Sequence, residues 1–149
     1  MSEKDRQQSV ESEAAILVGV VLPDASGTEE PLVELQGLAE TAGATIVGRM
    51  VQRREKPVGA TYLGTGKVDE LAELVETVKA DVILFDNELT PAQTRNIEKA
   101  TCVKVLDRTE LILDIFASHA QTLESRLAVE LAQLEYSLPR LKRMWTHLS

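Results

Sequence analysis

The sequence predicts an α/β fold: a small parallel sheet of four strands flanked by helices in the flavodoxin-like or doubly wound manner, followed by a long helix forming one arm of a helical hairpin. Three observations support this prediction. Short apolar runs of strand length alternate with helical segments through residues 14–106. The first run is apolar throughout, as in a strand buried on both faces of a parallel sheet. Residues 108–138 then contain neither glycine nor proline, which favours one continuous helix.

The first strand comprises residues 14–22, and a helix follows after a short loop. Pro31 suits the first turn of that helix, because the first turn leaves its N–H groups unused and proline has none. Gly43 suits its end, because glycine adopts the left-handed conformation of a helix terminus. Residues 44–51 are rich in β-branched side chains, as strands are. We therefore expect a strand, a helix and a second strand in this part of the chain.

The next helix and the third strand follow a basic loop and a short extended segment, residues 60–63. Apolar residues from Val68 to Val78 recur at helical spacing, and residues 82–85 are again continuously apolar. Because strands and helices alternate, we expect parallel strands joined by right-handed crossovers. The sheet order that we expect is 2-1-3-4.

Two capping patterns mark the starts of the remaining helices. The Thr90 side chain can accept a hydrogen bond from the amide of Gln93, and the proline between them fills the first helical position. Residues 103–106 form the fourth strand. Asp107 and Glu110 then cap the long last helix.

The last helix carries a single apolar stripe. Its members are spaced 4, 3, 4, 4, 3 and 4 residues apart, which is typical of a helix that packs against a partner helix. Only 11 residues follow the last member. We therefore expect a second copy of the chain or a further segment to supply the other arm of the hairpin. The stripe consists of Phe116, Ala120, Leu123, Leu127, Leu131, Leu134 and Leu138.

Four regions are predicted along the chain. Residues 1–13 form a disordered polar tail that lacks the apolar centre of a secretory signal. Residues 14–108 form the α/β subdomain, residues 109–141 the long helix, and residues 142–149 the start of a linker. No apolar run is long enough to span a membrane. The single cysteine, Cys102, is expected to be a packed residue in a reducing, cytoplasmic setting.

Charge is distributed unevenly. The formal net charge of −8 argues against a general nucleic-acid binder. Residues 49–67, including Arg53 and Arg54, nevertheless carry five Lys or Arg against Glu55 alone, and residues 139–149 carry three and no acid. Local basic patches of this kind can dock on phosphates. The alternative interpretation is that both segments are solvated loops.

A glycine-rich turn with the sequence LGTGK precedes a helix. It matches neither standard nucleotide motif, since Val68 stands where a P-loop needs Ser or Thr and Asp69 where the dinucleotide fingerprint needs Gly or Ala. One interpretation is a tight turn that begins a helix. The other is a contact of Gly64, Gly66 and Lys67 with a phosphate of ATP or of an RNA backbone.

The residues after the third strand are acidic or polar. Asp86, Asn87 and Glu88 occupy the edge of the sheet where α/β proteins bind ligands, and in the nucleotide alternative Asp86 would hold magnesium. The other interpretation is a capping loop. His119 and His147 do not have the spacing of a metal site. We therefore expect neither a metal site nor catalytic residues in this chain.

Residues 136–147 combine the only tryptophan, Trp145, with the cations Arg140, Lys142 and Arg143. Aromatic and basic side chains at a helical tip can stack on bases and pair with phosphates. The segment can equally be a structural turn into a following domain. Both interpretations remain open at this point.

Several long blocks of the sequence resemble the N-terminal domain of the HflX-type GTPases. They occur in the same order as in that family and the resemblance extends over residues 14–149. The blocks are residues 62–71 (YLGTGKVDEL), 85–93 (FDNELTPAQ), 107–117 (DRTELILDIFA), 129–141 (VELAQLEYSLPRL) and 144–149 (MWTHLS).

The resemblance implies a ribosome-associated function. HflX-type proteins are GTPases that bind the large ribosomal subunit and split stalled ribosomes under stress such as heat. Their N-terminal part, an α/β subdomain with a helical hairpin, contacts ribosomal RNA near the peptidyl-transferase region. A Ras-like GTPase domain that binds GTP and Mg²⁺ follows it. No position of this sequence matches that domain, so we expect a truncated N-terminal domain without activity alone.

The resemblance also ranks the candidate residues. Arg140 and Trp145 are expected to contact RNA at the hairpin tip, with Lys142 and Arg143 beside them. Arg53 and Arg54 are weaker RNA candidates that rest on local charge. ATP binding through the Gly64–Lys67 turn is one alternative, because some members are reported to bind ATP in this domain. A homodimer formed through the apolar stripe is another. The expected partners are thus the large subunit and its RNA, and the protein's own GTPase domain.

Overall fold

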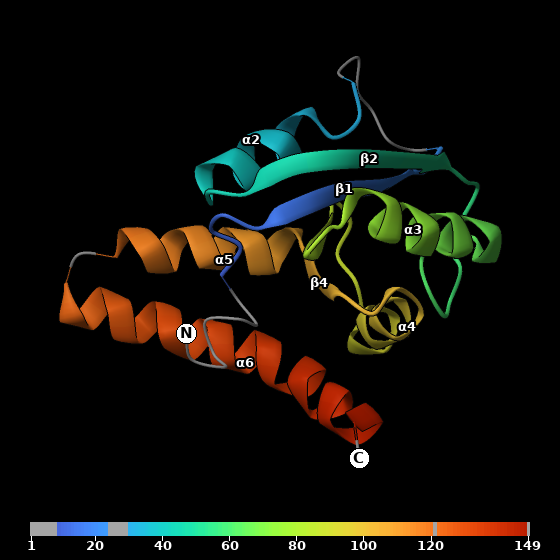
Figure 1. Cartoon of the computed structure of the whole chain (residues 1–149). Helices are drawn as coiled ribbons and strands as arrows, with labels where there is room; N and C mark the ends of the chain where they lie inside the picture. The colour runs from blue at the N-terminus through green and yellow to red at the C-terminus, as the bar shows by residue number, and fades with distance from the viewer. Residues whose placement is uncertain (1–8, 24–29, 121, 149) are drawn as a thin grey trace.

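The computed structural model describes residues 9–23, 30–120 and 122–148, the side chains of residues 141–148 excepted (Figure 1). At its centre is a parallel sheet with the order β2-β1-β3-β4. This confirms the α/β class and the expected order 2-1-3-4. The four strands are β1 (Ala14–Val21), β2 (Thr45–Arg53), β3 (Val82–Phe85) and β4 (Lys104–Asp107).

Helices cover both faces of the sheet and extend below it (Figure 1). Each face of the sheet has its own apolar cluster. Helices α2 and α5 contribute to the first cluster, and α3 and α4 contribute to the second. Alternate residues of β1 enter opposite clusters, Leu17 the first and Ile16 and Val18 the second. The helices are α2 (Val33–Thr41), α3 (Thr65–Val78), α4 (Pro91–Thr101), α5 (Arg108–His119) and α6 (Leu123–Leu148).

Local chemistry sets the starts of α4 and α5 where the sequence predicted them, whereas Pro31 lies before the N-cap Leu32 of α2 and not in the first turn of that helix. The Thr90 hydroxyl accepts from the Gln93 amide at 3.1 Å, and the Gln93 side chain accepts from the Thr90 amide at 2.9 Å. Asp107 and Glu110 form the same reciprocal capping box at the start of α5. Both predicted caps are therefore confirmed.

The expected continuous helix over residues 109–141 is wrong, because the structure divides it into α5 and α6. Ala120 is extended, with φ −70° and ψ 122°. The Thr122 hydroxyl accepts from the Ser125 amide at 3.0 Å, and the Ser125 hydroxyl accepts from the Thr122 amide at 3.1 Å. These bonds cap a new helix, which turns back along α5 and reaches α4 (Figure 1). Helices α5 and α6 thus form an adjacent pair, and the expected hairpin with an arm from a further segment or a second copy stays a prediction.

Three smaller expectations have different outcomes. The backbone of residues 142–148, expected as the start of a linker, continues α6 through Pro139 to Leu148. Cys102 is exposed and takes a left-handed conformation at the end of α4, so the expected packed role is wrong. Within the described residues no helix is long and apolar enough to cross a bilayer. The predicted domain boundaries remain predictions.

Candidate nucleic-acid interface

The crevice between the carboxyl ends of β1 and β3, where doubly wound sheets usually bind ligands, is filled by a side chain. The Asn87 amide group donates to the carbonyl of Val20 at 3.0 Å and accepts from its N–H at 2.8 Å. Asn87 thereby continues the hydrogen-bond ladder beyond Phe85. Next to it Asp86 accepts from Arg108 at 3.2 Å, and Arg108 also pairs with Glu34. The part of the carboxyl edge between β1 and β3 is thus occupied by protein groups.

The residues named for the ATP alternative are engaged within the protein. The Gly64 amide donates to the Gln52 side chain at 2.8 Å, and Lys67 pairs with Glu70 at 2.9 Å. Asp86 is held by Arg108, and the described residues contain no group of three potential metal ligands. These residues therefore do not form a preassembled site for magnesium and a nucleotide. ATP binding remains a prediction, for which a rise in melting temperature with ATP concentration is the direct test.

The basic loop after β2 and the glycine-rich turn lie side by side. A Cβ atom added at Gly64 would lie 2.8 Å from the Arg54 Nη1 and 3.0 Å from the Gln52 Nε2. Glycine at this position lets both side chains pack against the start of α3. Arg53 ends β2 and is exposed, and the space around Gly66 is open. The structure thus joins two sets of residues that sequence reasoning had treated separately.

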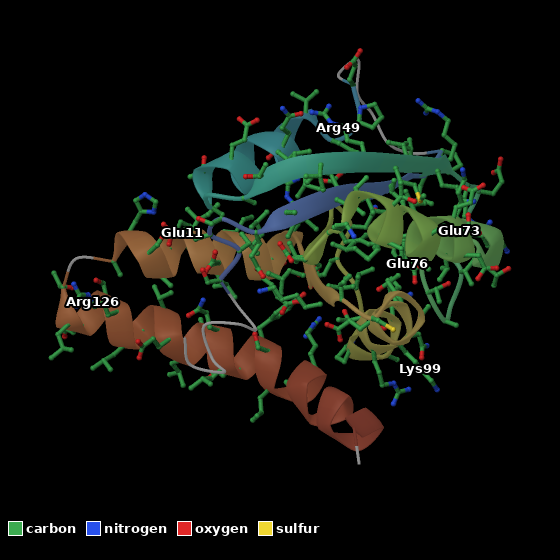
Figure 2. All side chains as sticks on the ribbon, viewed as in Figure 1. Glu11, Arg49, Glu73, Glu76, Lys99 and Arg126 are labelled. Carbon is green, nitrogen blue, oxygen red and sulfur yellow. The ribbon has the colours of Figure 1, made fainter. Side chains whose placement is uncertain are left out.

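Arg140 was expected to contact RNA at a hairpin tip, but its side chain is buried and bonded within the protein; the RNA contact itself stays a prediction. The turn between α5 and α6 lies near Arg126 (Figure 2). Arg140 is buried towards the other end of α6. Its Nη2 donates to the carbonyl of Leu89 at 2.7 Å, and its Nη1 donates to the carbonyl of Tyr136 at 2.7 Å. The guanidinium also lies 3.8 Å from the centre of the Tyr136 ring. This side chain anchors α6 to the α/β subdomain.

Four residues form what we call the anchor cluster: Asp107, Glu110, Tyr136 and Arg140. The Tyr136 hydroxyl donates to Asp107, which lies 3.8 Å from Arg140 and also accepts from the amide of Leu89. Burial raises the pKa of the Glu110 carboxyl to about 8, Asp107 adds to the rise and Arg140 opposes it. Burial and the bond to Asp107 also raise the pKa of Tyr136. The sequence had indicated only the cap formed by the first two residues.

Helix α6 buries polar side chains and exposes apolar ones, which is the reverse of an ordinary amphipathic helix. Gln133, Ser137 and Arg140 are buried against the rest of the protein. The apolar stripe faces outwards, from Leu123 at 73 % exposure to Leu138 at 49 %. The five leucines on α6 are exposed as expected, but Phe116 lies on α5 and Ala120 between the two helices, so the stripe is not the single face of one helix that was expected.

Two family models match the chain in succession. The one described as GTP-binding GTPase N-terminal matches residues 29–117, and the one described as GTP-binding GTPase middle region matches residues 119–149. The chain belongs to the HflX-type GTPase family. It is 47 % identical over 144 residues to the GTPase HflX of Flavobacterium psychrophilum, covering 95 % of this chain and 35 % of that protein.

Further relatives agree with this assignment. The GTPase HflX of Escherichia coli K12 is 43 % identical over 136 residues, covering 91 % of this chain and 32 % of that protein. A crystal structure of a GTP-binding protein from Sulfolobus solfataricus in complex with GDP is 26 % identical, with a TM-score of 0.63, and the match covers 90 % of this chain and 40 % of that one. The chain spans about a third of the length of the curated relatives that it matches.

In this HflX-type chain the predicted RNA residues therefore fall into three groups. Arg53 and Arg54 lie at the carboxyl edge of the sheet, beside Gly64. Arg140 belongs to the buried anchor cluster. The side chains of Lys142, Arg143 and Trp145 lie outside the described residues, although their backbone continues α6.

Proposed function

We propose that this chain is the ribosome-binding region of an HflX-type GTPase, docking on the RNA of the large subunit in the rescue of stalled ribosomes under stress. The match of both family models, in order over residues 29–117 and 119–149, carries the proposal. The region would act by binding and positioning. GTP hydrolysis in the whole protein would belong to its GTPase domain.

The charge distribution supports an RNA partner. The chain is acidic overall, with a net charge of −8, but cations are concentrated in residues 49–67 and 139–149. An acidic body resists general binding to polyanions, while local cations make contacts where the shapes fit. Contact through the second segment would come from Lys142, Arg143 and Trp145.

Co-sedimentation with isolated large and small ribosomal subunits tests the proposal. We expect retention on the large subunit that weakens steeply with salt, because each phosphate contact contributes roughly −0.7 to −0.9 to the slope of log K against log salt concentration. Equal retention on both subunits, or a slope near zero, would contradict a specific RNA contact.

A charge-matched pair of variants locates the contact. The double variant Lys142→Gln/Arg143→Gln is expected to reduce the magnitude of the salt slope by about 1.5, the loss of two phosphate contacts. The control is Lys79→Gln/Lys99→Gln. Lys79 and Lys99 are exposed near the ends of α3 and α4, the helices that lead into the amino-terminal ends of β3 and β4. This control removes the same charge and is expected to leave the slope unchanged.

A further inference from the structure

A hollow of about 400 Å³ lies at the carboxyl edge of β1 and β2. Val21 and Arg53 are the last paired residues of these strands, and the amide of Arg54 donates to the carbonyl of Val21 at 3.0 Å. One wall of the hollow is apolar and the other is charged. The walls are Val21, Leu22 and Pro23 on one side and Arg53, Arg54 and Glu55 on the other.

Arg54 is held in place before any ligand arrives. Its Nε donates to the carbonyl of Lys56 at 3.1 Å. Its Nη1 occupies the space that a side chain at position 64 would need, 2.8 Å from the place of a Cβ atom on Gly64. Gly64 is buried under these groups. A positioned guanidinium loses less conformational entropy on binding an anion than a freely moving one.

Within the described residues the two guanidinium groups of this wall, those of Arg53 and Arg54, form no ion pair with a carboxylate. A guanidinium binds phosphate through two parallel hydrogen bonds, and its flat face stacks on a base. The apolar wall opposite can receive the face of a base, and Glu55 can accept a hydrogen bond from a base amino group. The volume is at the lower end of the roughly 300–1,000 Å³ typical of small-molecule sites.

We propose that this hollow takes one unpaired nucleotide of an RNA strand. The base lies against Val21, Leu22 and Pro23, and its phosphate binds Arg53 and Arg54. A base within a duplex is stacked on both sides and cannot enter, so the site selects single-stranded segments, loops and bulges. The inference rests on the proposed function and assigns the basic loop a specific partner: unpaired RNA.

Fluorescence anisotropy with short labelled RNAs tests this site. The full chain is titrated into hexauridylate, an abasic hexamer with the same backbone, and a duplex RNA of equal phosphate number. We expect the hexauridylate to bind about tenfold more tightly than the abasic hexamer or the duplex. The loss of one contact to a charged group or to a buried base changes the dissociation constant by about this factor. Equal affinity for the hexamer and its abasic form, or for the duplex, would overturn the proposal.

Two glycine variants separate positioning from charge. Gly64→Ala keeps every cation but pushes on Arg54 and Gln52, whereas a Cβ at Gly37, on α2, meets no atom within 4 Å. Gly64→Ala is expected to weaken hexauridylate binding several-fold, as is Arg54→Gln, while Gly37→Ala leaves it unchanged. Binding by Gly64→Ala and Arg54→Gln equal to that of the unmodified chain would refute the site.

Ribosome co-sedimentation of the same variants distinguishes the two proposals. If the unmodified chain binds large subunits but shows no preference for the unpaired RNA, the nucleotide site is wrong and the proposed function stands. If the chain prefers unpaired RNA but does not sediment with large subunits, the proposed function fails and the site stands. Melting temperatures of all variants show whether each one is folded.

Discussion

The α/β subdomain and α6 bury opposite kinds of side chain. In the subdomain alternate residues of the strands enter two apolar clusters. In α6 the buried side chains include Gln133, Ser137 and Arg140, while the leucines face outwards. The subdomain is thus stabilised mainly by apolar burial, and α6 by specific polar contacts that depend on geometry. Its leucine face remains available for a partner.

The largest effect is expected from the anchor cluster. Replacing Arg140 by methionine leaves the buried Asp107 without its cation and removes the donors to Leu89 and Tyr136. A buried charge that loses its partner costs roughly 3–5 kcal/mol. Denaturant titration measures this loss, and hydrogen exchange shows whether α6 opens first. A change below about 1 kcal/mol would mean that α6 is held by its other contacts.

A pair of leucine truncations compares the two regions directly. Leu71 is fully buried in the subdomain, whereas Leu131 is 57 % exposed on α6. Leu71→Ala is expected to cost about 2–5 kcal/mol, because it leaves a cavity. Leu131→Ala is expected to stay within about 0.5 kcal/mol. Equal losses of stability for Leu71→Ala and Leu131→Ala in a monomeric sample would contradict the difference between the two regions.

The stability of the chain is expected to fall as pH rises. Burial raises the pKa of Glu110 from 4.5 to about 8 and that of Glu98 from 4.5 to about 7. Both carboxyls favour the protonated form in the folded protein, so their stabilisation is complete below about pH 4.5 and is lost as pH rises towards 8. Glu110→Gln, which is neutral at every pH, is expected to flatten this dependence between pH 5 and 8. Urea titration across this range measures the slope, and an unchanged slope would contradict the assignment.

The smallest effect concerns self-association. An exposed apolar stripe favours weak pairing between copies, so light scattering is expected to show a mass that rises with protein concentration. Leu131→Glu places a charge in the middle of the stripe and is expected to abolish the rise, whereas Arg126→Glu near the turn is the control. A constant monomer mass for the unmodified chain would argue against the homodimer alternative.

The sequence alone determined the parts of this protein that depend on neighbouring residues. Continuous apolar runs predicted the buried strands, and the pairs Thr90–Gln93 and Asp107–Glu110 predicted two helix starts, because a capping box is formed within four residues. The alternation of strands and helices then restricted the topology, since crossovers between parallel strands are right-handed. The spacing of the leucines likewise identified the stripe.

The tertiary structure decided what depends on residues distant in the chain. The apolar spacing runs on through Ala120, so periodicity could not reveal that Thr122 and Ser125 begin a second helix. Arg140 appeared as a surface cation because its partners, Leu89 and Asp107, are more than 30 positions away. Whether a charged side chain binds a ligand or anchors its own fold depends on which groups the folded chain brings within hydrogen-bond distance, and spacing along the sequence does not contain that information.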